Sequence, residues 1–287
     1  MRIMVTGGSG KLGRATVADL RAHGHETWNL DIVPPRDPAG HFTRVDLTDF
    51  GQVYESFRGL DEGWPAIDAV VHLAAVPGAS QVPNAALFAN NIVGTYTVFS
   101  AARHAGIRNV VWASSETLLG LPFDTPPPYV PVDEEYAVRP ESAYSLAKAL
   151  DEEMARHFCR WDPELKMIGL RFSNVMEPAD YARFPGFDGD PLERKWNLWG
   201  YIDARDGAQA VRLALEHRAT GMDVFVIANA DTVMDRSSAD LMAEVFPGVE
   251  VRRTLGEHET LLSVDKARQV LGYEPRHSWR DEVGPTR

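Results

Sequence analysis

The sequence predicts an α/β protein built on a doubly wound parallel sheet. Three observations predict it. Short β-branched apolar segments alternate with helix-length amphipathic segments over the first two thirds of the chain, a glycine-rich turn follows the first apolar segment, and hydroxyl residues follow a later one. Such alternation is typical of parallel strands joined by crossover helices. A smaller C-terminal part of different composition is expected to form a cap on the sheet edge.

The first 174 residues are expected to form one domain of alternating strands and helices. Each expected strand is a short apolar run: Ile3–Val5, Glu26–Leu30, Phe42–Val45, Ala69–Leu73, Asn109–Trp112 and Met167–Leu170. The expected helices are Lys11–His23, Phe50–Arg58, Asn84–Ala105 and Ser142–Arg160. Residues 122–131 contain five prolines, so this segment is predicted to be a stiff loop without regular structure.

The composition changes after Asn174. Residues 177–191 are rich in Pro, Gly, Asp and aromatic residues, which predicts a loop-like insertion. A helix is expected near Ala204–His217, a strand at Val224–Ala228 and a helix near Ser237–Val245. Residues 175–287 are therefore assigned mainly to a small C-terminal cap that binds substrate. Within it, residues 204–228 are expected to pack back on the main sheet.

Composition and charge exclude several classes of protein. The 287 residues are 44% hydrophobic and 24% charged, which is enough for a core without disulfides or metals. The net charge of −12 argues against nucleic acid or an anionic membrane as a partner. The lone cysteine, Cys159, fits a reducing compartment. No apolar run approaches the roughly 20 residues needed to cross a bilayer, so we expect a cytoplasmic protein.

A glycine-rich turn joins the first expected strand to the first expected helix. Residues 7–13 read Gly-Gly-Ser-Gly-Lys-Leu-Gly, and this spacing lets the backbone turn tightly and approach a pyrophosphate at the helix N-terminus. The alternative is a glycine turn without a ligand, but the strand–turn–helix context favours a Rossmann-type dinucleotide site. The predicted cofactor contacts here are Gly7, Gly8, Ser9, Gly10, Lys11, Leu12 and Gly13.

Asp31 predicts which dinucleotide binds. It ends the second expected strand, where a carboxylate accepts hydrogen bonds from ribose hydroxyls and repels a 2′-phosphate. NAD is therefore favoured over NADP. Lys11, Arg14 and Arg36 could meet an additional phosphate, but we expect them to be solvated surface cations.

Tyr144 and Lys148 are four positions apart in an expected helix, so both project from one helix face. A tyrosine hydroxyl has a pKa near 10, and lowering it to about 7 requires roughly 4 kcal/mol, which a nearby ammonium and an oxidised nicotinamide can supply. Tyr144 could then remove the proton of a substrate hydroxyl. The strand at Asn109–Trp112 continues into residues 113–117, Ala-Ser-Ser-Glu-Thr, which places hydroxyls at the sheet edge where open α/β folds bind ligands.

Together these segments resemble the extended short-chain dehydrogenase/reductases of the NAD-dependent epimerase/dehydratase type. The resemblance is carried by ordered motifs along nearly the whole chain: Thr6–Gly13, Asp46-Leu47, His72–Ala75, Asn91, Ser114-Ser115, Pro131–Glu134, Pro140–Tyr144 with Lys148, Leu170–Asn174, Ser263–Arg268 and Leu271–Pro275.

The resemblance implies a seven-stranded Rossmann core with Tyr144, Lys148 and Ser115 as the catalytic residues. Ser114 is the alternative serine, because Ala113 stands where the family often has another hydroxyl. Further implied cofactor contacts are Asp46 and Leu47 beside the adenine, Leu73, Ala74 and Ala75 along the dinucleotide, Asn91 as a structural or relay residue, and Tyr144 and Lys148 near the nicotinamide ribose. The helices Asn84–Ala105 and Ser142–Arg160 would form a homodimer contact, as in the family.

Predicted substrate contacts are Val76, Ser115, Glu116, Thr117, Tyr144, Asn174 and Arg183. Arg183 belongs to a cationic group with Arg194 and Lys195 that could bind a carboxylate or phosphate. His72 is expected to be a buried structural residue. No histidines have metal-ligand spacing, so no metal is predicted.

Three functional hypotheses follow. The favoured one is an NAD(P)-dependent oxidoreductase that acts on a secondary hydroxyl of a sugar-like or related small polar substrate and releases the reduced cofactor. The second is a nucleotide-sugar epimerase or dehydratase, which returns the hydride and retains NAD. The third is a non-catalytic dinucleotide sensor. The short cap and Leu119-Gly120, where many nucleotide-sugar epimerases carry Tyr-Gly, favour the first.

Overall fold

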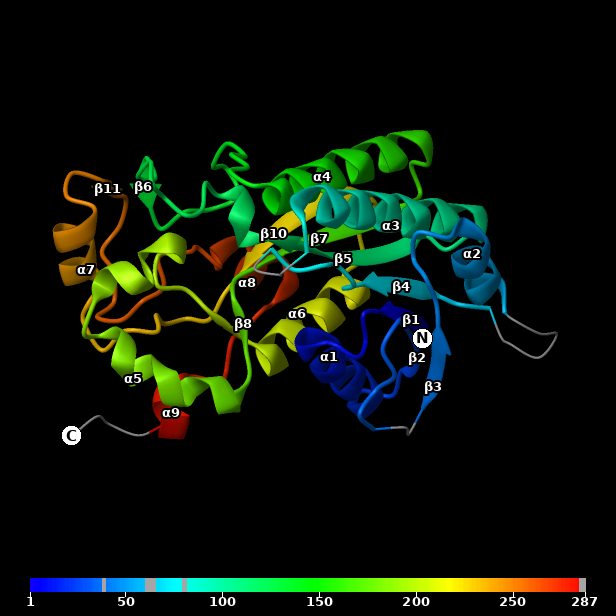
Figure 1. The fold of residues 1–287 in the computed structure, drawn as a ribbon, viewed down its shortest axis with the longest axis horizontal. Coiled ribbons are helices and arrows are strands. Elements are labelled where there is room, and N and C mark those ends of the chain that lie inside the picture. The colour runs from blue at the N-terminus through cyan, green and yellow to red at the C-terminus, as the bar shows by residue number, and fades with distance from the viewer. Residues whose placement is uncertain (38–39, 60–65, 79–81, 284–287) are drawn as a thin grey trace.

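The computed structural model describes residues 1–37, 40–59, 66–78 and 82–283 (Figure 1). Its centre is a sheet of seven strands in the order β10-β7-β5-β4-β1-β2-β3, with every pair parallel. The strands are β1 (Arg2–Thr6), β2 (Glu26–Asp31), β3 (His41–Arg44), β4 (Ala69–His72), β5 (Asn109–Ser115), β7 (Lys166–Phe172) and β10 (Gly221–Ile227). This confirms the predicted doubly wound Rossmann-type sheet.

Helices cover both faces of the sheet. On one face α1 (Lys11–Ala22) packs beside α6 (Ala204–Glu216), and the other face carries α2 (Phe50–Arg58), α3 (Asn84–His104) and α4 (Ala143–Trp161) (Figure 1). Their bounds agree with the predicted helices to within a residue or two. Local signals explain this agreement, since Asp49 caps α2 and Ser142 caps α4 through hydrogen bonds to backbone N–H groups.

Consecutive residues of a strand pack into two different hydrophobic clusters, one on each face of the sheet. Val70 and Val110 belong to the apolar cluster under α2, α3 and α4, whereas Val71 and Val111 belong to the cluster on the α1 and α6 side. Side chains alternate across a strand, and both faces of this sheet are covered. The middle residues of the central strands are therefore apolar on both faces, which is why short apolar runs marked these strands in the sequence.

Several strands extend beyond their apolar runs. β5 continues through Ser115, β7 runs from Lys166 to Phe172, and β10 begins at Gly221, three residues before the expected start. The additional residues are partly polar, and those of β5 and β7 that are polar are buried. Ser114 and Arg171 both bind Glu152, and Lys166 donates to backbone carbonyls. Polar residues with partners in other elements extend these strands, and an apolar pattern alone cannot detect them.

Residues 122–131 are not wholly irregular, which corrects the sequence prediction. Tyr129–Val130 forms β6, which pairs in parallel with β11 (Glu250–Val251). Val130 is buried and its carbonyl accepts from the Arg252 N–H, while Pro131 ends the strand. Pairing with a distant segment therefore allows two residues of regular strand in a proline-rich stretch.

The expected loop at residues 177–191 is also corrected. This segment lies between two short strands that pair with each other, β8 (Val175–Met176) and β9 (Ile202–Asp203). It contains a 3-10 helix at Pro178–Arg183 and α5 (Phe184–Phe187). Tyr181, Phe184 and Phe187 are buried in the main core. Their packing stabilises short helical turns that local composition does not favour.

The remaining C-terminal helices are α7 (Ser238–Val245), α8 (Asp265–Leu271) and α9 (Trp279–Val283), of which only α7 was expected. α8 and α9 are short, and each is anchored by a few buried residues such as Leu271 and Trp279. In the described ranges no helix is long and apolar enough to cross a membrane.

Candidate active site

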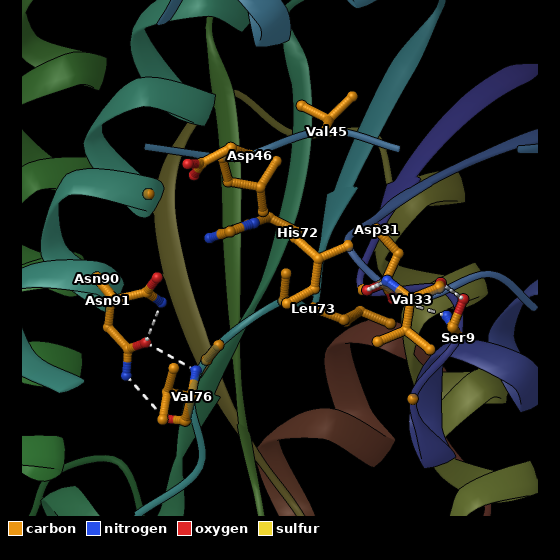
Figure 2. A pocket seen from close by; sticks show the side chains of 17 residues that line it. Ser9, Asp31, Val33, Val45, Asp46, His72, Leu73, Val76, Asn90 and Asn91 are labelled. Carbon is orange, nitrogen blue, oxygen red and sulfur yellow. Dashed lines mark hydrogen bonds between the residues drawn. The ribbon is translucent and has the colours of Figure 1, made fainter. Parts of the chain in front are cut away.

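A cavity of about 380 Å³ opens at the carboxyl ends of β1 and β4 (Figure 2). These strands are neighbours in the sheet, and the chain winds away from them in opposite directions, which makes this position the topological switch point where such folds bind ligands. The cavity is lined by these predicted residues: Gly7, Ser9, Gly10, Asp31, Asp46, Leu47, Leu73, Ala74, Ala75, Val76 and Asn91. It is also lined by residues that the sequence analysis did not assign to the site: Ile32, Val33, Val45, Asn90 and Gly94, together with His72.

The glycine turn requires glycine for steric reasons. Gly7 has a φ of 72°, and a Cβ there would lie 2.6 Å from the Ala74 nitrogen. A Cβ on Gly13 would lie 2.1 Å from the Gly7 carbonyl oxygen. The backbone therefore passes close to β4, the first turn of α1 packs directly on the loop, and the turn leaves space at its outer side for a dinucleotide.

The Asp31 side chain binds the backbone of the glycine turn. Its carboxylate accepts hydrogen bonds from the Ser9 N–H at 3.0 Å and the Val33 N–H at 3.1 Å, and Figure 2 shows Ser9 beside it at the cavity wall. The sequence predicted a ribose contact at Asp31 but missed this bond to Ser9. A carboxylate oxygen can accept more than one hydrogen bond, so Asp31 can hold the turn and still bind hydroxyls.

Lys11 and Leu12 do not line the cavity. The Lys11 ammonium donates to Asp180 at 2.5 Å, and the Leu12 side chain lies against Gly207 on α6. Arg14 likewise binds Glu177 at 2.7 Å. Two of the three cations that could have met an additional phosphate are thus paired with carboxylates that follow β8.

Gly8 also lies outside the cavity lining. A Cβ there would lie 2.3 Å from the Asn29 amide oxygen, so Gly8 allows close packing of the turn on β2. Among the described residues, no cluster of His, Cys, Asp and Glu could hold a metal ion.

The opposite wall is held by Asn91 on α3. Its amide oxygen accepts from the Val76 N–H at 2.8 Å, and its amide nitrogen donates to the Val76 carbonyl at 2.9 Å (Figure 2). The Asn91 side chain therefore makes, with the backbone of Val76, the two hydrogen bonds that a neighbouring strand would otherwise make. This gives Asn91 a structural role at the predicted cofactor site.

His72 is buried between β1 and α3. Its ring nitrogens lie 2.7 Å from the Thr6 hydroxyl and 3.2 Å from the Thr95 hydroxyl. Burial and the Lys148 charge lower the pKa of His72 to about 3, so the imidazole is neutral at pH 7. This arrangement fits the structural role expected from the sequence.

Tyr144 and Lys148 lie on one face of α4, next to the end of β5. The Lys148 ammonium is buried, donates to the Ala113 carbonyl at 2.7 Å, and lies 5.9 Å from the centre of the Tyr144 ring. A Cβ on Gly78 would lie 3.1 Å from the Tyr144 ring, so the segment after β4 packs closely on this tyrosine. The cation thus lies near the tyrosine whose ionisation it is expected to favour.

Ser115 is placed differently from Ser114. The Ser114 hydroxyl donates to Glu152 at 2.6 Å in the interior, where Arg171 also binds Glu152. Ser115 accepts from both the Thr117 N–H at 3.1 Å and the Thr117 hydroxyl at 3.0 Å. These bonds use the acceptor positions of the Ser115 oxygen and leave its proton to donate. Ser115 thus keeps a proton that can be donated, whereas the Ser114 hydroxyl is engaged with Glu152.

Glu116 and Thr117 follow Ser115 and both have hydrogen-bond partners within the protein. Glu116 is 3% exposed and accepts from the Ser173 hydroxyl at 2.6 Å and the Asn197 amide at 3.3 Å. Burial raises the pKa of Glu116 to about 7. The Thr117 hydroxyl is bonded to Ser115. Glu116 is thus held in the interior and Thr117 is half-buried, and their contact with a substrate stays a prediction.

Arg183 lies at the end of the 3-10 helix Pro178–Arg183. Its side chain is 63% exposed and forms an ion pair with Asp180 at 3.4 Å, and its substrate contact stays a prediction. Arg194 instead is buried, with its guanidinium 5.2 Å from the Phe187 ring centre and 3.4 Å from the Asn174 amide oxygen. Asn174, predicted as a substrate contact, is half-buried and lies next to this arginine.

A parallel doubly wound sheet with a glycine turn and a cavity at its switch point defines a Rossmann-type dinucleotide-binding fold. Tyr144, Lys148 and Ser115, the predicted catalytic residues, lie outside the lining of this cavity. The chain belongs to the NAD dependent epimerase/dehydratase family, because the model of that family matches residues 3–228. This confirms the family predicted from the motifs, and NAD is the cofactor of the family, as expected. The glycine cradle and the cavity fit such a ligand.

Curated relatives and solved structures agree with this assignment. The chain is 27% identical to a UDP-glucose 4-epimerase of Lactobacillus helveticus, over 99% of this chain and 94% of the relative. It is 27% identical to the UDP-glucose 4-epimerase of Corynebacterium glutamicum over 97% and 92%. A short-chain dehydrogenase/reductase superfamily protein of Agrobacterium tumefaciens, solved with bound NAD, shares the fold with a TM-score of 0.74 and 24% identity, covering 99% of this chain and 95% of that one.

Proposed function

We propose that this protein oxidises a secondary hydroxyl of a sugar-like substrate, with Tyr144 as the base and NAD as the hydride acceptor. The observation that carries the proposal is the buried Lys148 ammonium next to Tyr144, at the strand end that also carries Ser115. Family membership in a group of NAD-dependent enzymes supports it and argues against a non-catalytic sensor.

Each residue then has a defined role. Lys148 favours the tyrosinate form of Tyr144, whose oxygen removes the proton of the substrate hydroxyl. Ser115 donates a hydrogen bond to the same substrate oxygen as it becomes a carbonyl oxygen. When bound, NAD supplies the acceptor for the hydride that leaves the adjoining carbon. Gly7, Ser9, Asp31 and the Val76 segment would hold it along the cavity.

The fate of the reduced cofactor separates two forms of this function. The small size of the part that follows Asn174, together with Leu119-Gly120 in place of Tyr-Gly, supports a small substrate with release of NADH. The second candidate is a nucleotide-sugar 4-epimerase that returns the hydride. The curated relatives named as UDP-glucose 4-epimerases support this candidate over the full length of the chain.

A substrate panel distinguishes the two candidates. The purified protein is mixed with excess NAD and with free sugars, sugar acids, polyols or UDP-sugars, and both NADH absorbance and product composition are followed. We expect NADH to accumulate with one class of free sugar or sugar acid. Interconversion of a UDP-sugar without NADH would instead establish the epimerase.

The Tyr144→Phe variant tests the base. It removes only the hydroxyl, so we expect turnover to fall by about three orders of magnitude or more, since general-base catalysis contributes about 10²–10⁴. NAD affinity, measured by titration calorimetry, is expected to stay within about threefold of the unsubstituted protein. Tyr136→Phe, on a hydroxyl outside α4, is the control and should retain full turnover. Equal turnover in the two variants would exclude Tyr144 as the base.

We further propose a homodimer formed through α3 and α4. Val93 and Tyr96 on α3 and Leu146 and Leu150 on α4 are exposed apolar side chains on neighbouring helices (Figure 1). An apolar face of this kind suits a two-fold contact between identical chains.

A cytoplasmic location is also proposed, supported by the free and buried Cys159.

A further inference from the structure

A second buried charge lies beside the lysine of the proposed active site. Asp151 is fully buried on α4, one turn after Lys148, and its Oδ2 atom lies 3.4 Å from the Lys148 ammonium. Its Oδ1 atom has no hydrogen-bond partner in the part of the chain that the structure describes. The proton transfer described above does not use this carboxylate.

Asp151 is poorly explained as a purely structural ion pair. A buried pair rarely stabilises a fold more than apolar residues of similar volume would, because both ions lose their hydration. The next residue, Glu152, shows what a well-satisfied buried carboxylate looks like. It accepts two hydrogen bonds from Arg171 and a third from Ser114. Asp151 instead faces the ammonium at the longer distance of 3.4 Å, with Thr95 as its other polar neighbour.

The Lys148 ammonium has three N–H donors, and in the described part of the chain two of them have protein partners. One points to the Ala113 carbonyl at 2.7 Å and one to Asp151 at 3.4 Å, which fixes the ammonium between the end of β5 and α4. The third remains for a ligand. Asp151 therefore contributes both to the direction of the ammonium and to the net charge that Tyr144 experiences.

We propose that Asp151 is a positioning residue for Lys148: its carboxylate holds the ammonium beside Ala113 and offsets part of its positive charge, and so limits how strongly Lys148 favours the tyrosinate form of Tyr144. This inference rests on the proposed role of Tyr144 as the base. A carboxylate near the lysine opposes tyrosine ionisation, because it repels the phenolate and reduces the field of the cation.

Among the titratable groups near Asp151 that are named here, Asp151 is the one whose charge changes near neutral pH. Glu152 on α4 is closed in its pair with Arg171 on β7. His72 on β4, which reaches this region through Thr95, is neutral because its pKa is about 3. Burial raises the pKa of Asp151 to about 6, against the opposing effects of Lys148 and Thr95. Its charge is thus present at pH 7 and is lost as the pH falls below about 6.

Asp151→Asn separates charge from shape. The amide has the size of the carboxylate and still offers an oxygen to Lys148, but carries no charge. The readout is the ultraviolet absorbance of the Tyr144 phenolate during a pH titration of the NAD complex, taken as the difference from the same protein carrying Tyr144→Phe. This difference isolates Tyr144 from the other tyrosines, four of which have raised pKa values: Tyr129, Tyr181, Tyr201 and Tyr273.

We expect the Tyr144 midpoint to move to lower pH in Asp151→Asn, by on the order of half to one pH unit. Glu153→Gln is the matched control. It removes a negative charge from the adjacent position of α4, where the side chain is exposed and binds Arg156 at 3.0 Å, and should leave the midpoint unchanged. If Asp151→Asn does not fold, Asp151→Ser removes the same charge with a smaller side chain.

The titration distinguishes failure of the Asp151 inference from failure of the proposed role of Tyr144 as the base. An unchanged or higher midpoint in the folded Asp151 variant overturns the inference. A midpoint near 10 in the unsubstituted protein overturns the base role of Tyr144. Even then, a lower midpoint in Asp151→Asn would support the charge offset.

Discussion

Asp31 shows how one side chain serves both the turn and the ligand at the residue scale. Its carboxylate holds the Ser9 and Val33 N–H groups and also lines the cavity. The positive end of the glycine turn is thereby partly neutralised before any cofactor binds. A second negative group at this position, such as a 2′-phosphate, would face the carboxylate directly.

Asp31→Asn is predicted to relax the preference for NAD. The amide oxygen can still accept from Ser9, but the charge that repels a 2′-phosphate is gone. We expect the affinity for NADP relative to NAD to rise about tenfold, equivalent to about 1.4 kcal/mol. Titration calorimetry with each dinucleotide measures both dissociation constants. Asp68→Asn, at an exposed carboxylate that binds the Arg2 N–H, is the control, and an equal ratio in both variants would contradict the prediction.

At the element scale, Lys166 connects β7 to the end of α6. Its ammonium donates to the carbonyls of Ala214, Leu215 and His217 at 2.8 to 2.9 Å. The last carbonyls of a helix have no partners within the helix and carry partial negative charge, so a cation there is favourable. Burial lowers the pKa of Lys166 to about 8, and the side chain stays charged at pH 7.

Lys166→Met is therefore predicted to destabilise the fold. Methionine fills a similar volume but leaves buried carbonyls without their donor, so we expect the free energy of unfolding to fall by about 2 to 3 kcal/mol. Urea denaturation followed by circular dichroism measures this. Lys195→Met is the matched control and should change stability by less than about 0.5 kcal/mol, since Lys195 makes only a 3.6 Å ion pair with an exposed Asp124. Similar stability of the two variants would argue against the helix-end role.

At the scale of the whole molecule, the proposed homodimer would form through the outer faces of α3 and α4. These helices pack against each other, and their exposed apolar residues lie away from the cavity-lining Asn90, Asn91 and Gly94. Association through this face would leave both nucleotide cavities open. It would also hold the helix that carries Tyr144 and Lys148 against a second copy.

Val93→Glu is predicted to convert the dimer to a monomer. A two-fold contact brings each new carboxylate close to its copy, and desolvation with like-charge repulsion opposes association. Light scattering at micromolar concentration measures the molar mass. Leu192→Glu, at an exposed apolar position of the cap, is the control and should remain dimeric. A monomeric mass for the unsubstituted protein would contradict the proposed dimer itself.

Local patterns of the sequence determined the sheet, the helices that cover it and the family. Short segments carry the strand and helix periodicity and the caps such as Ser142. They also carry the spacing of the glycines in the turn that lies close to the end of β4. The four-residue spacing of Tyr144 and Lys148 likewise follows from helix geometry alone. These features therefore remain readable without a structure.

Only the tertiary structure decided how polar side chains are used. Glu116 is buried because Ser173 and Asn197, far away in the sequence, bind its carboxylate, while Arg183 turns to solvent. Packing of Tyr181 and Phe184 into the core made helical turns of an expected loop. The contact of Asp151 with Lys148 also depends on where α4 lies on the sheet. Burial and hydrogen-bond partners are set by segments that meet only in the folded chain, and local propensity carries no record of them.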